Sequence, residues 1–332
     1  GSLARDASLA QLVARTFPGG WLATGSTTPH RRVAMPIPLS AQTHGMGDLR
    51  LRSRRDAGMI SSFVQRNRAY LEAMARRACS SITLTPEHVL CRVLGKYLMY
   101  VDPHDFGITP HLALNGCWEP WITLALARLV QPGWRCLDVG ANVGYYSLIL
   151  AEGVGPNGRV MAIDPNPDVL RLLQLNLHVN GLASRVDVRG CAAWENEGKS
   201  HLSIRRHDPG QASVCIDQGA DASRIEVDTT TLDRLTADWP RVDLIKVDAE
   251  GAEPQIWRGM QEMLARNPTV AVVMEFAPRR YPDPDYFLNE ITTRGFVLRQ
   301  IAADGTIALL DRAQITSALT HGDWVMLFLV RS

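Results

Sequence analysis

The chain has 332 residues, of which 46% are hydrophobic and 21% charged, and its mean hydropathy is -0.07. This composition is typical of a globular protein with a full core, and it excludes a disordered chain or a fibrous repeat. No apolar run reaches the ~18 residues of a membrane-spanning helix, so we expect no membrane span. A start at Gly1-Ser2 is typical of a cloning remnant, and the natural chain could extend upstream.

The net charge of +1 is distributed unevenly along the chain. Residues 1–80 hold 12 Arg and 4 acidic residues, a balance of +8, which leaves a balance of -7 for residues 81–332. A basic arm before an acidic body predicts either recognition of an anionic partner or packing of the arm on an acidic surface. We therefore expect the arm to cover an acceptor site or to mediate a homo-oligomer, and we expect no nucleic-acid partner.

Six cysteines occur without a CxxC pair and without a histidine at metal-ligand spacing. A chain of this length builds its own core and does not need disulfides, so the pattern favours reduced thiols in a cytoplasmic protein and no structural zinc site. The six are Cys79, Cys91, Cys117, Cys136, Cys191 and Cys215.

The N-terminal third is predicted to contain little regular structure before a helix and a hairpin. Pro and Gly punctuate residues 1–55, which predicts an extended arm. Asp56 is the expected N-cap of a helix that ends near Ala78. Residues 89–102 are predicted to form a β-hairpin, and a helix is expected over 120–130. We accordingly divide the chain into a basic arm with a helix, residues 1–80, and a single domain, residues 81–332. Within this domain the hairpin covers 89–102 and the cofactor-binding core covers 133–332.

Beyond residue 133 the pattern alternates between apolar strands and helices. Strands of nearly continuous Val, Ile and Leu are buried on both faces, so the alternation predicts a doubly wound, mostly parallel α/β sheet. The expected strands are 135–139, 159–163, 186–189, 244–247, 270–274, 296–301 and 324–330, and the expected helices are 145–152, 168–180 and 254–266.

A glycine-containing loop follows the first of these strands. The segment reads LDVGANVGYYS, with Asp138 at the strand end and Gly140 and Gly144 leading into a helix. Such glycines let a ligand approach the backbone at a helix start. Asn142 stands where the dinucleotide fingerprint has its second glycine, and Asp138 would disfavour a pyrophosphate. The loop therefore favours a ligand with an amine and a sulfonium centre over a nicotinamide dinucleotide.

A carboxylate ends the next strand. Asp164 lies 24 positions after Gly140, where doubly wound nucleotide-binding folds place the acid that binds ribose hydroxyls. The alternative is that Asp164 only caps the helix that begins near Asp168.

Several acids follow the later strands. The segment IKVDAEGAE carries Lys246 within an apolar strand and then Asp248, Glu250 and Glu253. Strand alternation places Lys246 and Asp248 on the same side, so the lysine would hold that carboxylate in its charged form. Glu275 ends the following strand. These acids could deprotonate an acceptor hydroxyl, bind the cofactor, brace loops, or hold a divalent ion, of which we favour the first.

Taken in order, four motifs resemble those of the FkbM-like methyltransferases, which use S-adenosylmethionine. The motifs are LDVGANVGYYS, AIDPNP, IKVDAEGAE and VVMEF, preceded by NGCWEP at 115–120. The resemblance covers the chain from about Val89 onward. It implies a class I methyltransferase fold, with a seven-stranded, mostly parallel sheet whose last strand is antiparallel. It also implies methylation of a hydroxyl on a sugar, glycan or polyketide-type product. The family often has a histidine shortly after the acid at the Glu275 position, whereas Phe276-Ala277 follow here.

The site predicted from these observations has a catalytic and a cofactor-binding part and no metal. Two other functions stay open, a nicotinamide-dependent oxidoreductase and a non-catalytic cofactor-binding scaffold. The expected catalytic residues are Asp248, Lys246, Glu250 and Glu275, and the expected cofactor-binding residues are Glu119, Asp138, Gly140, Asn142, Gly144, Asp164, Asn166, Ala192 and Asp248.

Overall fold

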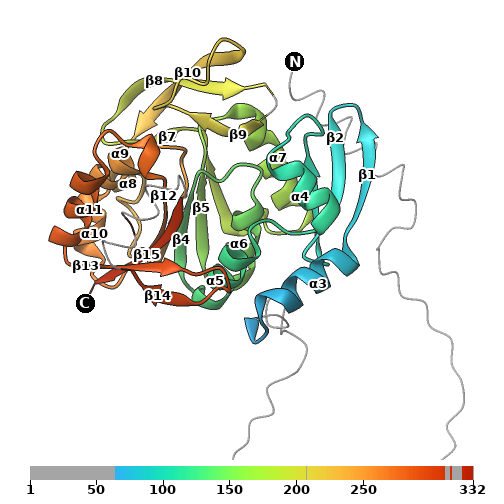
Figure 1. Ribbon diagram of the computed structural model, residues 1–332, viewed down its shortest axis with the longest axis horizontal. Helices are drawn as coiled ribbons and strands as arrows, with labels where there is room; N and C mark the ends of the chain where they lie inside the picture. The colour runs from blue at the N-terminus through green and yellow to red at the C-terminus, as the bar shows by residue number, and fades with distance from the viewer. Residues whose placement is uncertain (1–63, 207, 311–314, 316–323, 332) are drawn as a thin grey trace, which may run out of the picture. The chain divides into compact units, whose positions relative to one another are not determined.

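The computed structural model describes residues 64–206, 208–310, 315 and 324–331 (Figure 1). The expected arm and the Asp56 cap lie outside these residues. Within the described part of the chain, no helix is both long and apolar enough to cross a membrane.

A mixed sheet of eight strands forms the core, in the order β14-β13-β15-β12-β11-β4-β5-β6 (Figure 1). The five strands from β12 to β6 run parallel, and the last strand, β15, is antiparallel to both of its neighbours, as predicted. All seven predicted strands are present. The bounds are β4 Arg135–Val139, β5 Arg159–Ile163, β6 Val186–Arg189, β11 Leu244–Val247, β12 Ala271–Phe276, β13 Phe296–Ile301, β14 Ile307–Leu309 and β15 Val325–Arg331.

The eighth strand, β14, corrects the expected count of seven. It is only three residues long and pairs antiparallel with β13 at the edge of the sheet. Its residues are apolar, but a strand of three residues is shorter than the apolar runs that predict a strand.

Helices cover both faces of this sheet. Helices α5 to α7 lie on one side and α8 to α11 on the other (Figure 1). The predicted helix 254–266 is divided at Gly259, where a Cβ atom would lie 1.9 Å from the Trp194 carbonyl oxygen. The bounds are α5 Pro120–Leu129, α6 Tyr145–Val154, α7 Pro167–Val179, α8 Leu232–Leu235, α9 Glu253–Arg258, α10 Gln261–Arg266 and α11 Pro284–Thr293, with 3-10 turns at Ala183–Arg185 and Pro278–Arg280.

A small N-terminal layer packs on this body. Helix α3 (Arg68–Ala78) begins after Asn67, whose side chain accepts a hydrogen bond from the Tyr70 amide at 3.0 Å. The predicted hairpin is confirmed as β2 (His88–Val93) and β3 (Tyr97–Val101), and β1 (Ser80–Thr85) adds a third strand. The layer also contains α4 (Ile108–Asn115), and α3 packs against both α4 and α5.

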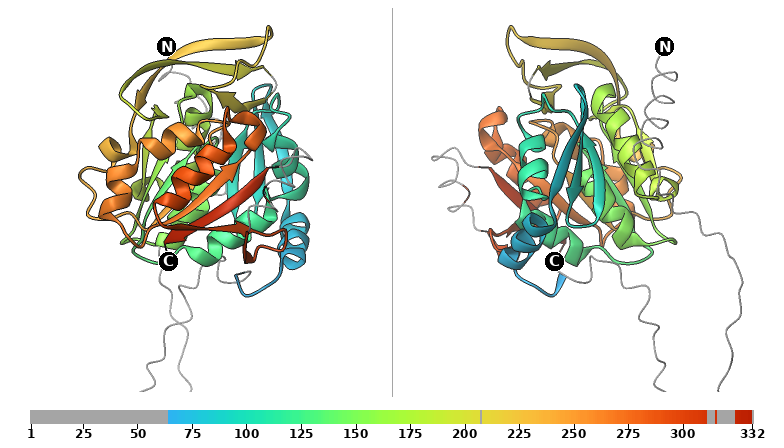
Figure 2. Two further views of the ribbon diagram at one scale, coloured as in Figure 1. Left: turned by 60° about the vertical axis from the view of Figure 1, so that its left-hand side comes forward. Right: turned by 90° about the vertical axis from the view of Figure 1, so that its right-hand side faces the viewer.

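A second sheet of four strands was not predicted. Its order is β7-β10-β8-β9, with bounds Ala192–Ala193, Ala222–Thr230, Gly198–Arg205 and Asp208–Ser213. It lies above one end of the central strands (Figure 2). In β8 and β10 the apolar residues alternate with polar ones, as in 202–204 and 225–227, so no continuous apolar run marks these strands.

Candidate active site

The loop from β4 to α6 passes close to the end of β11. Gly140 has a φ of +72°, and a Cβ atom there would lie 1.7 Å from the Asp248 carbonyl oxygen. The amides of Gly140 and Ala141 both donate to the Ile163 carbonyl, at 2.9 and 3.1 Å. Glycine is therefore required at position 140 because the neighbouring chain leaves no room for a side chain.

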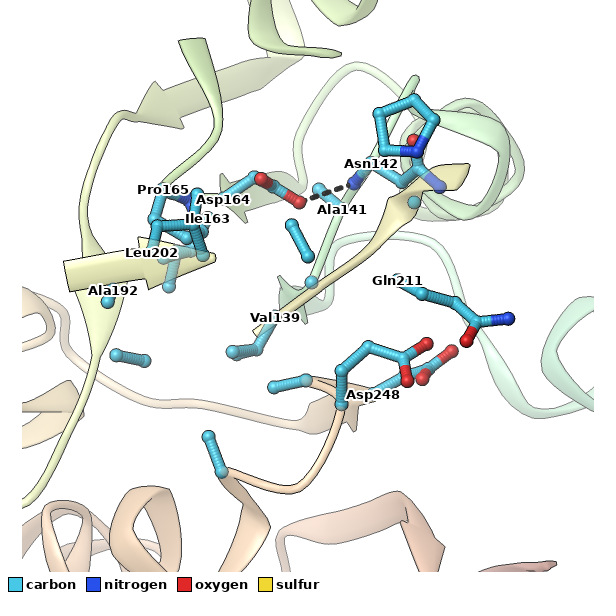
Figure 3. Close-up of a pocket in the computed structure, with 18 of the residues that line it drawn as sticks. Val139, Ala141, Asn142, Ile163, Asp164, Pro165, Ala192, Leu202, Gln211 and Asp248 are labelled. Carbon is cyan, nitrogen blue, oxygen red and sulfur yellow. Dashed lines mark hydrogen bonds between the residues drawn. The ribbon is translucent and has the colours of Figure 1, made fainter. Parts of the chain in front are cut away.

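A pocket lies at the carboxyl ends of β4, β5 and β11, and β9 supplies a further wall (Figure 3). Asp164 and Asp248 lie on opposite sides of this pocket, which we call the cofactor pocket, and Gln211 lies near Asp248 (Figure 3). Open α/β sheets bind their ligands at this edge. Of the predicted residues, the pocket is lined by Gly140, Asn142, Asp164, Ala192, Lys246, Asp248 and Glu250.

Asp164 is almost fully buried beside the loop. Its Oδ2 accepts from the Asn142 amide and its Oδ1 from the Asn166 amide, both at 2.9 Å. Burial raises its pKa to about 6, although these two hydrogen bonds act in the opposite direction. Each oxygen retains a further lone pair that could accept a ribose hydroxyl.

Asn166 and Gly144 were predicted to bind the cofactor, but neither lines the cofactor pocket. The Asn166 side chain accepts from the Asp168 amide at 3.0 Å and is the N-cap of α7. The alternative that Asp164 is that cap is therefore wrong. Gly144 has a φ of +89° and serves as the residue before α6.

Asp138 supports the site from beneath and does not face the cofactor pocket, which corrects its predicted contact with the cofactor. Its side chain is fully buried and points toward α6, where the Ser147 hydroxyl donates to it at 2.6 Å. Its other oxygen lies 3.5 Å from the Lys246 ammonium. Burial raises the pKa of Asp138, and Lys246 opposes this shift.

Lys246 is 2% exposed and lies between two carboxylates. Its ammonium is 3.5 Å from both Asp138 and Asp248 and donates to the Gly140 carbonyl at 3.0 Å. Burial lowers the pKa of Lys246, but Asp248, Asp138 and Glu119 raise it further, so the net shift is upward. Lys246 therefore remains charged and fixes the ends of β4 and β11 relative to each other.

A second pocket of about 440 Å³ adjoins the first, and we call it the acceptor pocket. Four residues line both cavities: Trp118, Gln211, Asp248 and Glu250. Its size is within the range of small-molecule sites. Further lining residues are Arg68, Glu72, Arg76, His111, Glu119, Trp121, Glu275, Arg280 and Trp324.

Arg280 organises the acids of the acceptor pocket, and sequence reasoning missed it. One of its guanidinium nitrogens lies 2.8 Å from both Glu250 and Glu275. Burial and the nearby Asp248 raise the pKa of Glu250 to about 8, and they raise that of Glu275 well above its usual range. Arg280 opposes both shifts. It lies in the 3-10 turn that follows β12, and an Arg in such a turn has no distinctive sequence pattern.

Glu119 lies in the acceptor pocket and not in the cofactor pocket, contrary to the prediction. Its carboxylate accepts from the Tyr146 hydroxyl at 2.7 Å. Burial and the charge of Asp248 raise its pKa to about 7.

Glu253 lines neither pocket and braces the loop after β11, so its predicted role toward the acceptor is wrong. It is fully buried, and its two oxygens accept from the Ala249 amide at 2.8 Å and the Gly251 amide at 3.0 Å. The Tyr281 hydroxyl donates to it at 3.0 Å as well.

Backbone strain is concentrated at these pockets. Among the described residues, four that are not glycine have a positive φ: Leu94, Glu119, Asn142 and Glu250. The last three line the pockets, with φ of 37°, 48° and 54°. Such conformations persist only where the surroundings enforce them, and they occur preferentially at functional sites.

The cofactor pocket has the chemistry that a nucleoside cofactor requires. Asp164 can accept from a ribose diol, and the Asn142 side-chain oxygen is buried with no hydrogen-bond partner in the described structure. Apolar side chains that can enclose a base complete the wall: Ile163, Leu202, Val214 and Ile256. Among the described residues, no group of three or more His, Cys, Asp or Glu is arranged to hold a metal ion.

Fold and site thus define a Rossmann-like α/β domain that binds a nucleoside cofactor beside a second, acid-lined pocket. The methyltransferase FkbM domain family matches residues 138–298, just under half of the chain. The chain therefore carries a methyltransferase FkbM domain, and the family implies S-adenosylmethionine as the methyl donor.

Individual relatives share about a third or less of their residues with this chain over the parts that match. A protein-L-isoaspartate O-methyltransferase of Aeropyrum pernix is 32% identical over 40% of this chain, and the match spans 46% of that enzyme. Methyltransferase sdnD of Sordaria araneosa is 28% identical over 55% of this chain and 78% of its own length. The crystal structure of methyltransferase FkbM from Methylobacillus flagellatus is 16% identical with a TM-score of 0.38, covering 62% of this chain and 52% of that one.

The raised pKa values of the site predict a pH-dependent stability. Asp164, Glu119 and Glu250 have folded-state pKa values of about 6, 7 and 8, above the range of an unfolded chain. At pH values between the unfolded-state and the folded-state pKa of these groups, the folded protein binds more protons than the unfolded one. The free energy of unfolding therefore falls as pH rises through this range. We expect the Tm of the ligand-free protein to fall by several degrees from about pH 5 to about pH 8.5, and Glu250→Gln to reduce this slope. Thermal unfolding at a series of pH values measures it, and an equal slope in both proteins would contradict it.

Proposed function

We propose that this protein transfers the methyl group of S-adenosylmethionine to a hydroxyl of a sugar, glycan or polyketide-type acceptor. The observation that carries this proposal is the wall shared by the two pockets, where the carboxylates of Asp248 and Glu250 lie. Two ligands, one bound in each pocket, would meet at these two acids. They are therefore placed to act on the bond that forms between the ligands.

When bound, the cofactor supplies an electrophilic methyl group on a sulfonium. The chain would position the acceptor oxygen in line with that methyl, and positioning alone provides much of the rate. The acceptor must also lose its hydroxyl proton, which we assign to the Asp248 carboxylate. The Lys246 ammonium lies 3.5 Å from that carboxylate and holds it in place at the end of β11. Glu250 and Glu275, fixed by Arg280, would accept hydrogen bonds from neighbouring hydroxyls of the acceptor.

The lining of the acceptor pocket suits a ring with several hydroxyls. Trp118, Trp121 and Trp324 provide apolar faces, and the rings of Trp121 and Trp324 are stacked with centroids 6.3 Å apart. Carboxylates and Arg280 supply hydrogen-bond partners elsewhere in the cavity. Arg68 and Arg76, from α3, also line the pocket, where they could meet a negative charge on the acceptor. We also propose that the N-terminal arm mediates a homo-oligomer.

Ligand binding and methyl transfer test the proposal separately. We expect calorimetric titration to show binding of S-adenosylmethionine and S-adenosylhomocysteine and not of nicotinamide dinucleotides. A screen of hydroxylated glycans and polyketides should then yield S-adenosylhomocysteine, and an excess of chelator should change the rate by less than about twofold because the acids act without a metal ion. Binding of a nicotinamide dinucleotide would favour an oxidoreductase, and inactivation by chelator with recovery in magnesium would make the acids metal ligands. Cofactor binding without turnover on any acceptor would favour a scaffold.

A further inference from the structure

We propose that Ser213 is a positioning residue that couples β9, the strand over the cofactor pocket, to the acid Glu250. Ser213 ends β9 and is 1% exposed. Its hydroxyl donates to the Glu250 carbonyl at 2.8 Å and accepts from the amides of Cys215 and Ile216 at 3.1 and 3.0 Å. One buried hydroxyl therefore joins the end of this strand to the loop that carries Glu250. The inference rests on the proposed function, since it assumes that a cofactor occupies the pocket beneath β9.

Glu250 depends on external support because its backbone is strained. Its φ is +54°, a left-handed conformation that residues with a Cβ adopt at a cost, and Gly251 follows with a φ of +100°. The carbonyl that Ser213 holds belongs to the peptide between these two residues. The Glu250 side chain is fixed independently, by Arg280 at 2.8 Å. Loss of the Ser213 hydroxyl would therefore remove one of the two anchors of this peptide, while the bond of the Gly251 amide to Glu253 and the ion pair of Glu250 remain.

The other end of β9 contacts the cofactor side of the pocket. Five successive residues, 208–212, line the cofactor pocket. A Cβ atom at Gly210 would lie 2.6 Å from the Asn142 side-chain nitrogen, and the Asn166 side chain donates to the Pro209 carbonyl at 3.4 Å. The strand thus contacts the glycine-containing loop through its first half and the acid loop through Ser213. A ligand that orders β9 would order Glu250 through this connection.

Hydrogen exchange with S-adenosylhomocysteine tests the connection without an acceptor. The amides of Ala249, Gly251 and Ala252 are hydrogen-bonded within the acid loop, so their exchange reports its order. In the wild type, we expect the ligand to slow exchange about fivefold or more in both 208–212 and 249–252. In Ser213→Ala, the slowing should persist in 208–212 and become clearly smaller in 249–252, where only the protection from direct contact of the ligand with Ala249, Glu250 and Ala252 would be left.

Ser203→Ala is the matched control. Ser203 is a buried serine of the same small sheet, and its hydroxyl accepts from the Gln218 amide at 3.1 Å. Among its described contacts none reaches Glu250, so this variant should keep the wild-type exchange pattern in both segments. Once an acceptor is known, Ser213→Ala should lower kcat about tenfold with the affinity for the cofactor nearly unchanged. Added to Glu250→Gln, it should have little further effect, because both act through the same group.

Each outcome bears on the proposal. Wild-type protein in which the ligand protects 208–212 and leaves 249–252 unchanged would overturn the coupling, whether or not the variant folds. Equal protection of 249–252 in Ser213→Ala and wild type would overturn the role of the hydroxyl. A wild type that binds no S-adenosylhomocysteine by calorimetry would instead refute the proposed function, and the inference with it.

Discussion

Replacing Asp248 with asparagine should lower turnover by about two orders of magnitude or more, the effect of losing a general base. Asp248 lines both pockets, and its carboxylate lies 3.5 Å from the buried Lys246 ammonium. The amide has the same shape but cannot take up the acceptor proton. Lys246 retains Asp138 and the Gly140 carbonyl as partners, so the fold should survive the change. Steady-state kinetics with saturating cofactor measure the loss.

Two controls separate chemistry from binding and folding. Calorimetry on Asp248→Asn should show cofactor affinity reduced much less than turnover. Asp187→Asn makes the same chemical change on β6 at an exposed position, and it should leave turnover unchanged. Near-normal turnover of Asp248→Asn would exclude this residue as the base and transfer that role to Glu250 or Glu275.

Asp164→Ala should weaken cofactor binding by about 100-fold or more, since two hydrogen bonds from a ribose diol to a carboxylate would be lost. The structure adds a second consequence. Both carboxylate oxygens also accept backbone amides, from Asn142 and Asn166, and these donors would lose their partner. We therefore expect a lower Tm for the ligand-free variant as well. Calorimetry measures the affinity, and thermal unfolding without ligand measures the stability.

Asp283→Ala shows whether lost stability alone weakens binding. It removes the side-chain cap of α11, which costs about 1 kcal/mol, without touching the lining of the cofactor pocket. We expect this variant to melt earlier and to bind the cofactor as the wild type does. Affinity of Asp164→Ala within about threefold of wild type would mean that Asp164 only braces the loop.

The residue pattern was sufficient to locate the main strands and the loop that follows the first of them. Short, mostly apolar segments such as 135–139 and 244–247, which are bounded by turn residues and alternate with helical patterns, predict strands that are buried on both faces. Asp164 and Asp248 were also predictable, since parallel strands bring their carboxyl ends to one edge. The position of Asp138 on β4 was predicted correctly, but the side to which its side chain points was not. Alternation along a strand does not say which face of the sheet carries the ligand.

What the tertiary structure alone decided is the environment of these residues. Arg280 and Ser213 are far from Asp248 and Glu250 in the sequence, and nothing in their local pattern marks them. Their roles come from long-range packing, which brings β9, α3 and the loop after β12 to the same edge of the sheet. The sequence by itself determined which groups end the strands, through local hydrophobic periodicity. Which of those groups are buried as supports, like Glu253, and which face a cavity, like Glu250, depends on contacts that form only when the chain is folded.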